Sequence, residues 1–256
     1  MRSGFNAWRN PEQEGVDLFP LLFAEDDAKP NPSESRIPLF DHHARYGRLR
    51  LHSLLPFIHR WFMPATPVNQ LVDSFIRNAG INPASTIAVL YRGTDKSTEV
   101  RLVPPQAYLV QAIELLRLNP EFTVLIQTDQ KQVRDLFVKE FGQRCRFIAD
   151  MPVTAGTKVL HELSTSELTL PRLQFAQSLI AACEVVSRCS YIINHTGNMA
   201  LWSVLYRGST ERTVQFDAFG LLTNELGQIQ PKDIPKALWR VFRKRAARVV
   251  GVKVTG

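Results

Sequence analysis

The chain has 256 residues, 45% of them hydrophobic and 9% aromatic, which is enough to bury a sizeable core and excludes an intrinsically disordered protein. It has no run of about 18 apolar residues and no apolar core in residues 1–15, so we expect no transmembrane helix, no signal peptide and a cytoplasmic protein. The net charge is +7, but removing the seven basic residues of segment 234–256 from the total of 31 leaves 24, equal to the 24 acidic residues, which excludes the distributed basic face of a nucleic-acid binder.

The N-terminal quarter of the chain carries few structural signals. Residues 1–55 are rich in Pro and charge, with short, broken apolar runs, and "EDDAKPNPSES" (25–35) is a loop. The first periodic segment is "PVNQLVDSFIRNAG" (67–80), whose apolar spacing predicts a helix that ends at Gly80. We therefore divide the chain into an N-terminal remnant or acceptor-side segment (1–60), a central domain (61–235) and a basic C-terminal helix (236–256).

The central domain alternates strands with helices. Short apolar runs rich in β-branched residues predict buried strands at 86–91, 122–128, 145–149 and 191–195. Amphipathic segments between them predict helices at 104–118, 130–141 and 171–188. This alternation indicates an α/β fold, a Rossmann-like parallel sheet with helices on both faces.

The basic C-terminal segment has two interpretations. Trp239 and Phe242 alternate with Lys and Arg residues, a pattern suited to a helix that lies on an anionic membrane surface as a peripheral contact. A terminal helix docked through the same two aromatic residues, with its charges in water, fits the pattern equally. The sequence leaves both open.

Polar residues cluster where three of the predicted strands end. They occur in "RGTDKSTE" after strand 86–91, in "TDQ" (128–130), and in "NHTGN" (194–198), which opens a further helix. In open parallel sheets ligands bind beyond the carboxyl ends of the strands, so the three segments should face one crevice. Arg92 and Lys96 supply positive charge there, and the turn at 196–198 allows close backbone approach, which suits the diphosphate of a nucleotide. Surface ion pairs such as Arg92 with Asp95, and an ordinary helix cap at the turn, are the alternatives.

These segments resemble the GDP-fucose-dependent fucosyltransferases related to the alpha-1,6-fucosyltransferases and the nodulation fucosyltransferases. The first motif of that family is a strand followed by His-x-Arg-Arg-Thr-Asp-Lys, a spacer and Glu, and "VLYRGTDKSTE" matches it at five positions. These are Arg92, Thr94, Asp95, Lys96 and, after a one-residue deletion, Glu99. "SRCSYIINHTGNMALWSVLYRG" resembles the third motif, and the resemblance spans about residues 60–210.

The resemblance implies a GT-B glycosyltransferase, with this part of the chain as its nucleotide-sugar-binding domain. Arg92 would bind the β-phosphate of the GDP-fucose donor, and Glu99 would be the general base that deprotonates a hydroxyl of a glycan or other acceptor, giving inversion without a metal. The other implied donor-binding residues follow the same strand ends: Gly93, Thr94, Asp95, Lys96, Asp129, His195, Thr196, Gly197 and Asn198.

The chain departs from the family pattern at three points. The first-motif His is Leu90 here, the second Arg is Gly93, and the Ser-Ser-Gln turn is Thr196–Asn198. Residues 1–60 are also short for an acceptor domain. A catalytically degenerate nucleotide-sugar-binding or scaffold protein is therefore the alternative to an active transferase.

Metal and disulfide chemistry has little support in the sequence. Cys145, Cys183 and Cys189 form neither a CxxC pair nor a disulfide framework, and we interpret them as small buried apolar residues. The histidines lack HxxxH and HExxH spacings, and there is no Asp-x-Asp clamp. We therefore expect no metal and no cofactor beyond the donor substrate.

Overall fold

The computed structural model describes residues 19–24, 45–49, 51–94, 99–155, 159–160, 163 and 170–224. Within these ranges the chain forms a six-stranded sheet with the strand order β3-β2-β1-β4-β5-β6. The strands are β1 (Thr86–Tyr91), β2 (Thr123–Thr128), β3 (Cys145–Arg146), β4 (Tyr191–His195), β5 (Thr213–Phe216) and β6 (Leu222–Asn224). The first five are parallel and β6 is antiparallel, which confirms the predicted α/β class.

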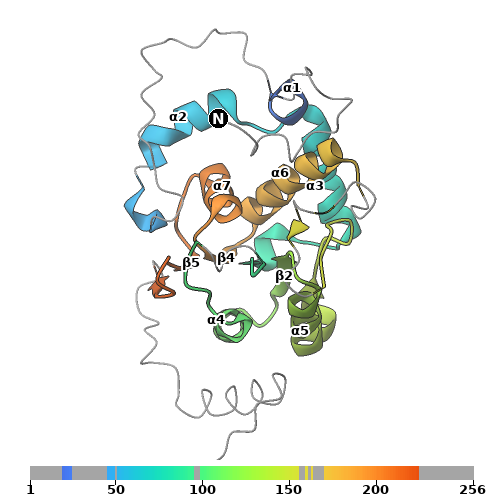
Figure 1. Cartoon of the computed structure of the whole chain (residues 1–256). Helices are drawn as coiled ribbons and strands as arrows, with labels where there is room; N and C mark the ends of the chain where they lie inside the picture. Colours follow the sequence, from blue (N-terminus) through green and yellow to red (C-terminus); the bar gives the residue numbers. More distant parts are fainter. Residues whose placement is uncertain are drawn as a thin grey trace, which may run out of the picture.

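Helices cover both faces of the sheet. They are α1 (Phe19–Leu22), α2 (Leu51–Trp61), α3 (Thr66–Asn78), α4 (Pro105–Leu118), α5 (Lys131–Phe141), α6 (Arg172–Arg188) and α7 (Asn198–Arg207). In Figure 1, α3, α6 and α7 lie above the sheet and α4 and α5 below it. Such covering explains why β1 is apolar along its whole length, since all six of its residues are buried.

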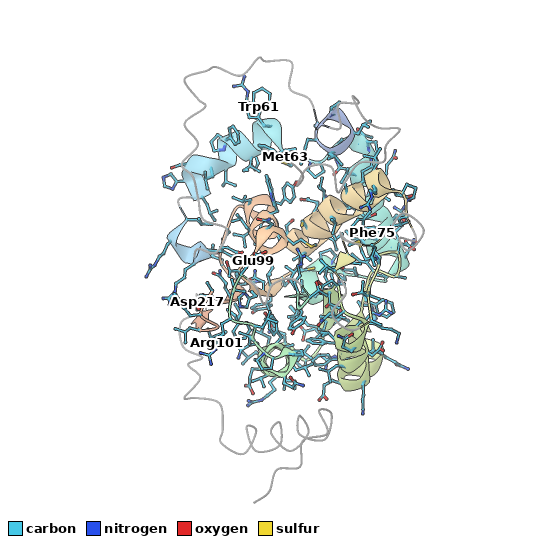
Figure 2. All side chains as sticks on the ribbon, viewed as in Figure 1. Trp61, Met63, Phe75, Glu99, Arg101 and Asp217 are labelled. Atoms are coloured by element: carbon cyan, nitrogen blue, oxygen red, sulfur yellow. The ribbon has the colours of Figure 1, made fainter. Side chains whose placement is uncertain are left out.

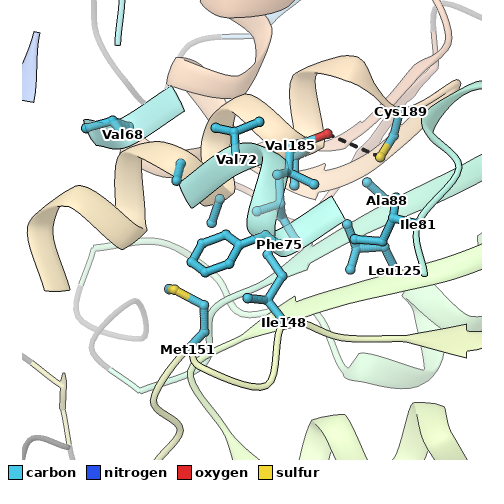
Figure 3. Packing of buried hydrophobic residues seen from close by; sticks show 14 of the residues in the cluster. Val68, Val72, Phe75, Ile81, Ala88, Leu125, Ile148, Met151, Val185 and Cys189 are labelled. Atoms are coloured by element: carbon cyan, nitrogen blue, oxygen red, sulfur yellow. Dashed lines mark hydrogen bonds between the residues drawn. The ribbon is translucent and has the colours of Figure 1, made fainter. Parts of the chain in front are cut away.

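The two faces of β1 belong to two separate cores. Ala88 and Leu90 pack with residues of α3 and α6, whereas Ile87 and Val89 pack with residues of α4 and α5. Figure 3 shows part of the first core, where Phe75 of α3, 2% exposed, packs over the sheet. Truncation of a buried phenylalanine to alanine typically costs about 3–5 kcal/mol, so this contact is a large contribution to stability.

A third apolar cluster joins the N-terminal part of the chain to α7. Leu54 and Ile58 of α2 pack with Leu201, Val204 and Leu205 of α7. The division that we predicted at residue 60 falls in the last turn of α2 and so cuts through a helix that packs on the central domain. The predicted basic helix (236–256) lies outside the described residues.

Several elements differ from those predicted. The strand predicted at 145–149 ends at Arg146, since only Cys145 and Arg146 pair with β2; the apolar residues Phe147 and Ile148 that suggested a longer strand pack in the two cores without pairing. Helix α2 and the strands β5 and β6 were not predicted at all. None of the helices within the described ranges combines the length and the apolar character that a membrane span requires.

Candidate functional site

The strand order reverses between β1 and β4, and this position defines the candidate site. From β1 the chain proceeds to β2 and β3 on one side, then returns to pair β4 against the other side of β1. Ligands of doubly wound sheets bind at this reversal, beyond the carboxyl ends of the strands. Arg92 follows β1, Asp129 follows β2 and Thr196 follows β4, so the sheet brings the three predicted segments to one edge.

A buried carboxylate organises the loop after β1. Asp129 is 5% exposed, and its Oδ2 accepts a hydrogen bond of 2.6 Å from the Thr94 hydroxyl. The Gly93 N–H donates to Oδ1 at 3.3 Å, and Arg92 Nε lies 3.7 Å from Oδ2. The side chain of Arg92 stays 33% exposed. Asp129 therefore holds the guanidinium in place while leaving part of it accessible to a ligand.

Gly93 has no room for a side chain. A Cβ added there would lie 2.6 Å from Oε1 of Gln130 and 2.8 Å from Cε1 of Tyr91. Gln130 is itself buried, so it has little freedom to move away. An arginine at this position, where the resembled family has its second one, would force Gln130 or Tyr91 to move. The adjacent Tyr91 remains protonated, since burial, aided by the Asp129 charge, raises its pKa to about 12.

Arg92 follows β1 at the edge of the sheet where β4 ends and α7 begins. It interacts electrostatically with Cys183 of α6, whose Sγ is 3.6 Å from the carbonyl oxygen of Met199. Burial raises the pKa of Cys183 to about 12, while a hydrogen bond with Ser203 and the Arg92 charge oppose the rise. The start of α7, which follows β4 at the same edge of the sheet as Arg92, has backbone N–H groups that lack intrahelical acceptors.

The turn between β4 and α7 is held by Tyr46, a residue far away in sequence. The Tyr46 hydroxyl donates to the Gly197 carbonyl at 3.0 Å and accepts from the Gly197 N–H at 2.9 Å. Gly197 has φ 151°, a conformation that favours glycine. Burial raises the pKa of Tyr46 well above its ordinary value, and hydrogen bonds with Gly197 and Thr196 offset only part of the rise. With the Gly197 N–H engaged, the donors left for an anion are those of the first turn of α7, beginning at Asn198.

His195 connects β4 to the segment that carries Glu99. Its Nε2 lies 3.2 Å from the carbonyl oxygen of Arg101, and its Nδ1 lies 3.3 Å from that of Thr196. His195 is 8% exposed, and its ring lies within hydrogen-bond distance of both carbonyl oxygens, so it joins the end of β4 to the segment around Arg101. Glu99 is exposed, and Figure 2 shows it in the same region as Arg101 and Asp217. Asp95 and Lys96 lie outside the described residues.

Sequence reasoning missed two residues of this site. Tyr46 falls in the N-terminal stretch that we left unassigned, and no local pattern marks it. Thr154 was also missed: its N–H donates to the Asp129 carbonyl at 2.8 Å, and its own carbonyl accepts from the Lys131 N–H at 2.9 Å. These two bonds fix the strand end that carries the Asp129 carboxylate.

The larger of the two cavities does not coincide with the candidate site, and the described residues include no cluster of metal-binding side chains. A cavity of about 730 Å³ is lined by residues 149–153, α3 and α6, but by neither Arg92 nor Asp129. No three His, Cys, Asp or Glu side chains among the described residues gather closely enough to hold a metal ion. The candidate site is therefore defined by its convergent polar groups at the strand reversal and not by cavity size.

Comparison with known proteins gives low similarity throughout. No family model matches the chain. No curated protein matches it either. Among solved structures, the chain is similar to NodZ alpha-1,6-fucosyltransferase co-crystallised with GDP, with 19% identity and a TM-score of 0.40 over 66% of this chain and 50% of that one. It is similar to NodZ alpha-1,6-fucosyltransferase soaked with GDP-fucose, with 19% identity and a TM-score of 0.42 over 69% of this chain and 53% of that one. It is also similar to fucosyltransferase NodZ from Bradyrhizobium, with 16% identity and a TM-score of 0.41 over 66% of this chain and 49% of that one. The chain spans about half the length of these structures.

Proposed function

We propose that the chain is a glycosyltransferase that binds a nucleotide sugar at the carboxyl ends of β1 and β4. The observation that carries this proposal is the partly exposed Arg92 side chain, paired with the buried Asp129 carboxylate at the point where the strand order reverses. A cation fixed there, beside the start of a helix, suits a diphosphate. The choice of GDP-fucose as the donor comes from the motif that Arg92, Thr94 and Glu99 share with the fucosyltransferases.

In this proposal Arg92 stabilises the leaving group. As the bond between the anomeric carbon and the β-phosphate oxygen breaks, negative charge grows on the diphosphate, next to the guanidinium and the first turn of α7. One such donor typically lowers the barrier by about 3 kcal/mol. Asp129 acts through Arg92, because it sets the position of the guanidinium.

Glu99 supplies the base in the same reaction. Its exposed carboxylate takes the proton from an acceptor hydroxyl while the hydroxyl oxygen attacks the anomeric carbon from the side opposite the diphosphate. Atoms and charge then balance without a metal: the proton goes to Glu99 and the electron pair of the broken bond leaves with GDP. The product has inverted configuration at the anomeric carbon.

A catalytically degenerate donor-binding protein is the second candidate, and two positions favour it. Leu90, where the family has histidine, is 6% exposed and packs in the core on the α3 and α6 side. Gly93, where the family has a second arginine, has no room for a side chain. Such a protein would bind the donor and turn over neither acceptor nor water.

Calorimetry tests the nucleotide site that both functions require. We expect the protein to bind GDP and GDP-fucose more tightly than GDP-mannose or UDP-glucose. Arg92→Ala should abolish GDP binding while leaving the fold intact, because Arg92 lies at a strand end outside the cores. Arg77→Ala, which removes an exposed cation of α3, is the matched control. Unchanged GDP affinity in Arg92→Ala would eliminate the proposed nucleotide site.

A transfer assay decides whether binding leads to turnover. If Arg92 and the start of α7 balance the diphosphate charge, fucose transfer should continue in excess EDTA. Activity that is lost in EDTA and restored by magnesium or manganese would replace our mechanism with a metal-assisted one. Tight binding of GDP-fucose with neither transfer nor hydrolysis would establish the degenerate binder.

A further inference from the structure

Two consecutive residues, Arg45 and Tyr46, bind the N-terminal part of the chain to the edge of the sheet that carries the candidate site. The Tyr46 hydroxyl accepts the Gly197 N–H at 2.9 Å and donates to the Gly197 carbonyl at 3.0 Å. The Tyr46 N–H donates to Oε1 of Gln215 in β5 at 2.8 Å. Arg45 donates through Nη2 to Oδ2 of Asp217, directly after β5, at 2.7 Å. The two residues therefore join the turn after β4 to the end of β5.

The turn at Gly197 depends on this distant tyrosine. Gly197 is the N-cap of α7, and as a glycine it has no side chain with which to cap the helix. Its backbone is nearly fully extended, with φ 151° and ψ 168°, so its N–H and its carbonyl point to the same side and one hydroxyl can bond to both. Glycine has the widest choice of backbone conformations, so without these two bonds the direction of the first turn of α7 would be less defined.

The Tyr46 ring is itself held by packing. Tyr46 is 1% exposed and belongs to the apolar cluster that Leu54 and Ile58 of α2 form with residues of α7. A phenylalanine at position 46 would keep these apolar contacts, because it differs from tyrosine only in the hydroxyl. One substitution therefore separates the contribution of the ring to packing from the contribution of the hydroxyl to the turn.

We propose that Tyr46 is a positioning residue of the donor site, which acts on the diphosphate through the turn at Gly197. The inference rests on the proposed function, in which the N–H groups at the start of α7 and the Arg92 guanidinium both bind the diphosphate. Tyr46 fixes the direction of these N–H groups, beginning at Asn198, before the donor binds, so that binding does not have to order the turn. Part of the segment 1–60, which we assigned to the acceptor side, thus serves the donor side.

Calorimetry on Tyr46→Phe tests the inference with two probes, GDP and guanosine, which has no phosphate. We expect GDP affinity to fall by about 10-fold, the effect of one or two hydrogen bonds of ordinary strength. Guanosine, measured by competition with GDP, should keep its wild-type affinity, because only the diphosphate meets the turn. A general loss of structural support would instead weaken both probes equally. Tyr206→Phe, which removes a hydroxyl at the last turn of α7 next to the same apolar cluster, is the matched control and should leave both affinities unchanged.

Amide hydrogen exchange gives a second measurement that needs no ligand. In Tyr46→Phe the Gly197 N–H loses its acceptor, so it should exchange faster than in the wild-type protein, whereas the amides of β1 should stay protected and so show that the variant has folded. Faster exchange at Gly197 combined with wild-type GDP affinity would overturn the inference. An equal loss of affinity for GDP and guanosine would overturn it as well.

The result for the proposed function is obtained separately. If the wild-type protein binds GDP and Arg92→Ala does not, while Tyr46→Phe binds GDP normally, the nucleotide site stands and only the role of Tyr46 is wrong. If the wild-type protein binds no GDP, the proposed function fails and the role of Tyr46 fails with it.

Discussion

The Asn194 side chain lies on the sheet in β4 with neither end of its amide hydrogen bonded. It is fully buried, and both Oδ1 and Nδ2 lack partners within the described structure. Its neighbour in register on β5, Gln215, has a partner in the Tyr46 N–H. Two side-chain amides on neighbouring strands, paired in register, therefore differ in whether they are hydrogen bonded.

Asn194→Leu should stabilise the protein. An unsatisfied buried polar group costs about 1–3 kcal/mol, so removing two such atoms should raise the free energy of unfolding by about 1 kcal/mol or more in a urea titration. Gln215→Leu is the matched control and should lower it, because the Tyr46 N–H then loses its acceptor. Equal destabilisation by both substitutions would mean that the Asn194 amide is hydrogen bonded in solution.

Glu99→Gln tests the proposed base. The amide keeps the size of the side chain but cannot accept the proton, so fucose transfer should fall by about 100-fold or more. GDP affinity should stay near that of the wild-type protein, because Glu99 is not placed in the diphosphate site. Glu114→Gln on α4 provides a comparable neutralisation away from the crevice and should leave the transfer rate unchanged. A transfer rate in Glu99→Gln equal to the wild-type rate would remove Glu99 from the mechanism.

The hairpin that joins β5 to β6 is stabilised by the hydrogen bonds and the ion pair of Asp217. Asp217 Oδ1 accepts the N–H groups of Phe219 and Leu221 at 3.0 and 2.9 Å, and Oδ2 accepts Arg45. Burial alone would raise the pKa of Asp217, but these hydrogen bonds together hold it below the ordinary value. The hairpin also receives the Arg101 N–H at the Ala218 carbonyl, so it supports the segment that carries Glu99.

The pH dependence of stability should carry the signature of Asp217. Because its folded pKa lies below the unfolded value of 3.8, its contribution is complete above that pH and is lost as the pH falls through the folded pKa. Asp217→Asn should lower the free energy of unfolding by about 1.5–3 kcal/mol at pH 7, a difference that shrinks below about pH 4. Asp135→Asn, which breaks an exposed pair with Lys131, should cost only about 0.3–0.5 kcal/mol. A deficit in Asp217→Asn that stays constant from pH 7 to pH 3 would contradict this account.

Elements were predictable from the sequence where one local signal dominated. The strand at 86–91 was found because all six residues are apolar or β-branched, as burial on both faces requires. Strand β5 was missed because it is four residues long and alternates polar Thr213 and Gln215 with apolar residues. Helix α2 was missed because Pro56 lies inside it, and proline normally argues against a helix interior.

The candidate site was predictable to a similar extent. The strand-end rule placed Arg92, Asp129 and Thr196 at one edge from the order of strands and helices alone. That Asp129 holds Gly93 and Thr94 needed coordinates, because the contact spans 35 residues and either carboxylate or hydroxyl could have faced a ligand. Tyr46 lies 151 residues from Gly197, and no periodicity in the sequence encodes that contact.

At the scale of the whole molecule, the three cysteines are all free and buried, as predicted. Cys183 and Cys189 are on or next to α6, and Cys145 begins β3 at the edge of the sheet. Burial raises the pKa to about 12 for Cys183 and Cys189 and to about 11 for Cys145. At pH 8 a thiol with a pKa near 12 is ionised to roughly one part in ten thousand, so the folded protein should be almost inert to thiol reagents.

The rate at which each cysteine reacts therefore reports how fast the structure around it unfolds. With a chromogenic disulfide reagent at pH 8, Cys145 should react first, because β3 has a single neighbouring strand and is the shortest strand of the sheet. Cys183 and Cys189 should follow together, at the rate at which α6 separates from the sheet. Cys145→Ser should remove the early phase alone. Labelling of Cys183 ahead of Cys145 would instead show that the protein opens first at α6, on the side where Arg92 lies.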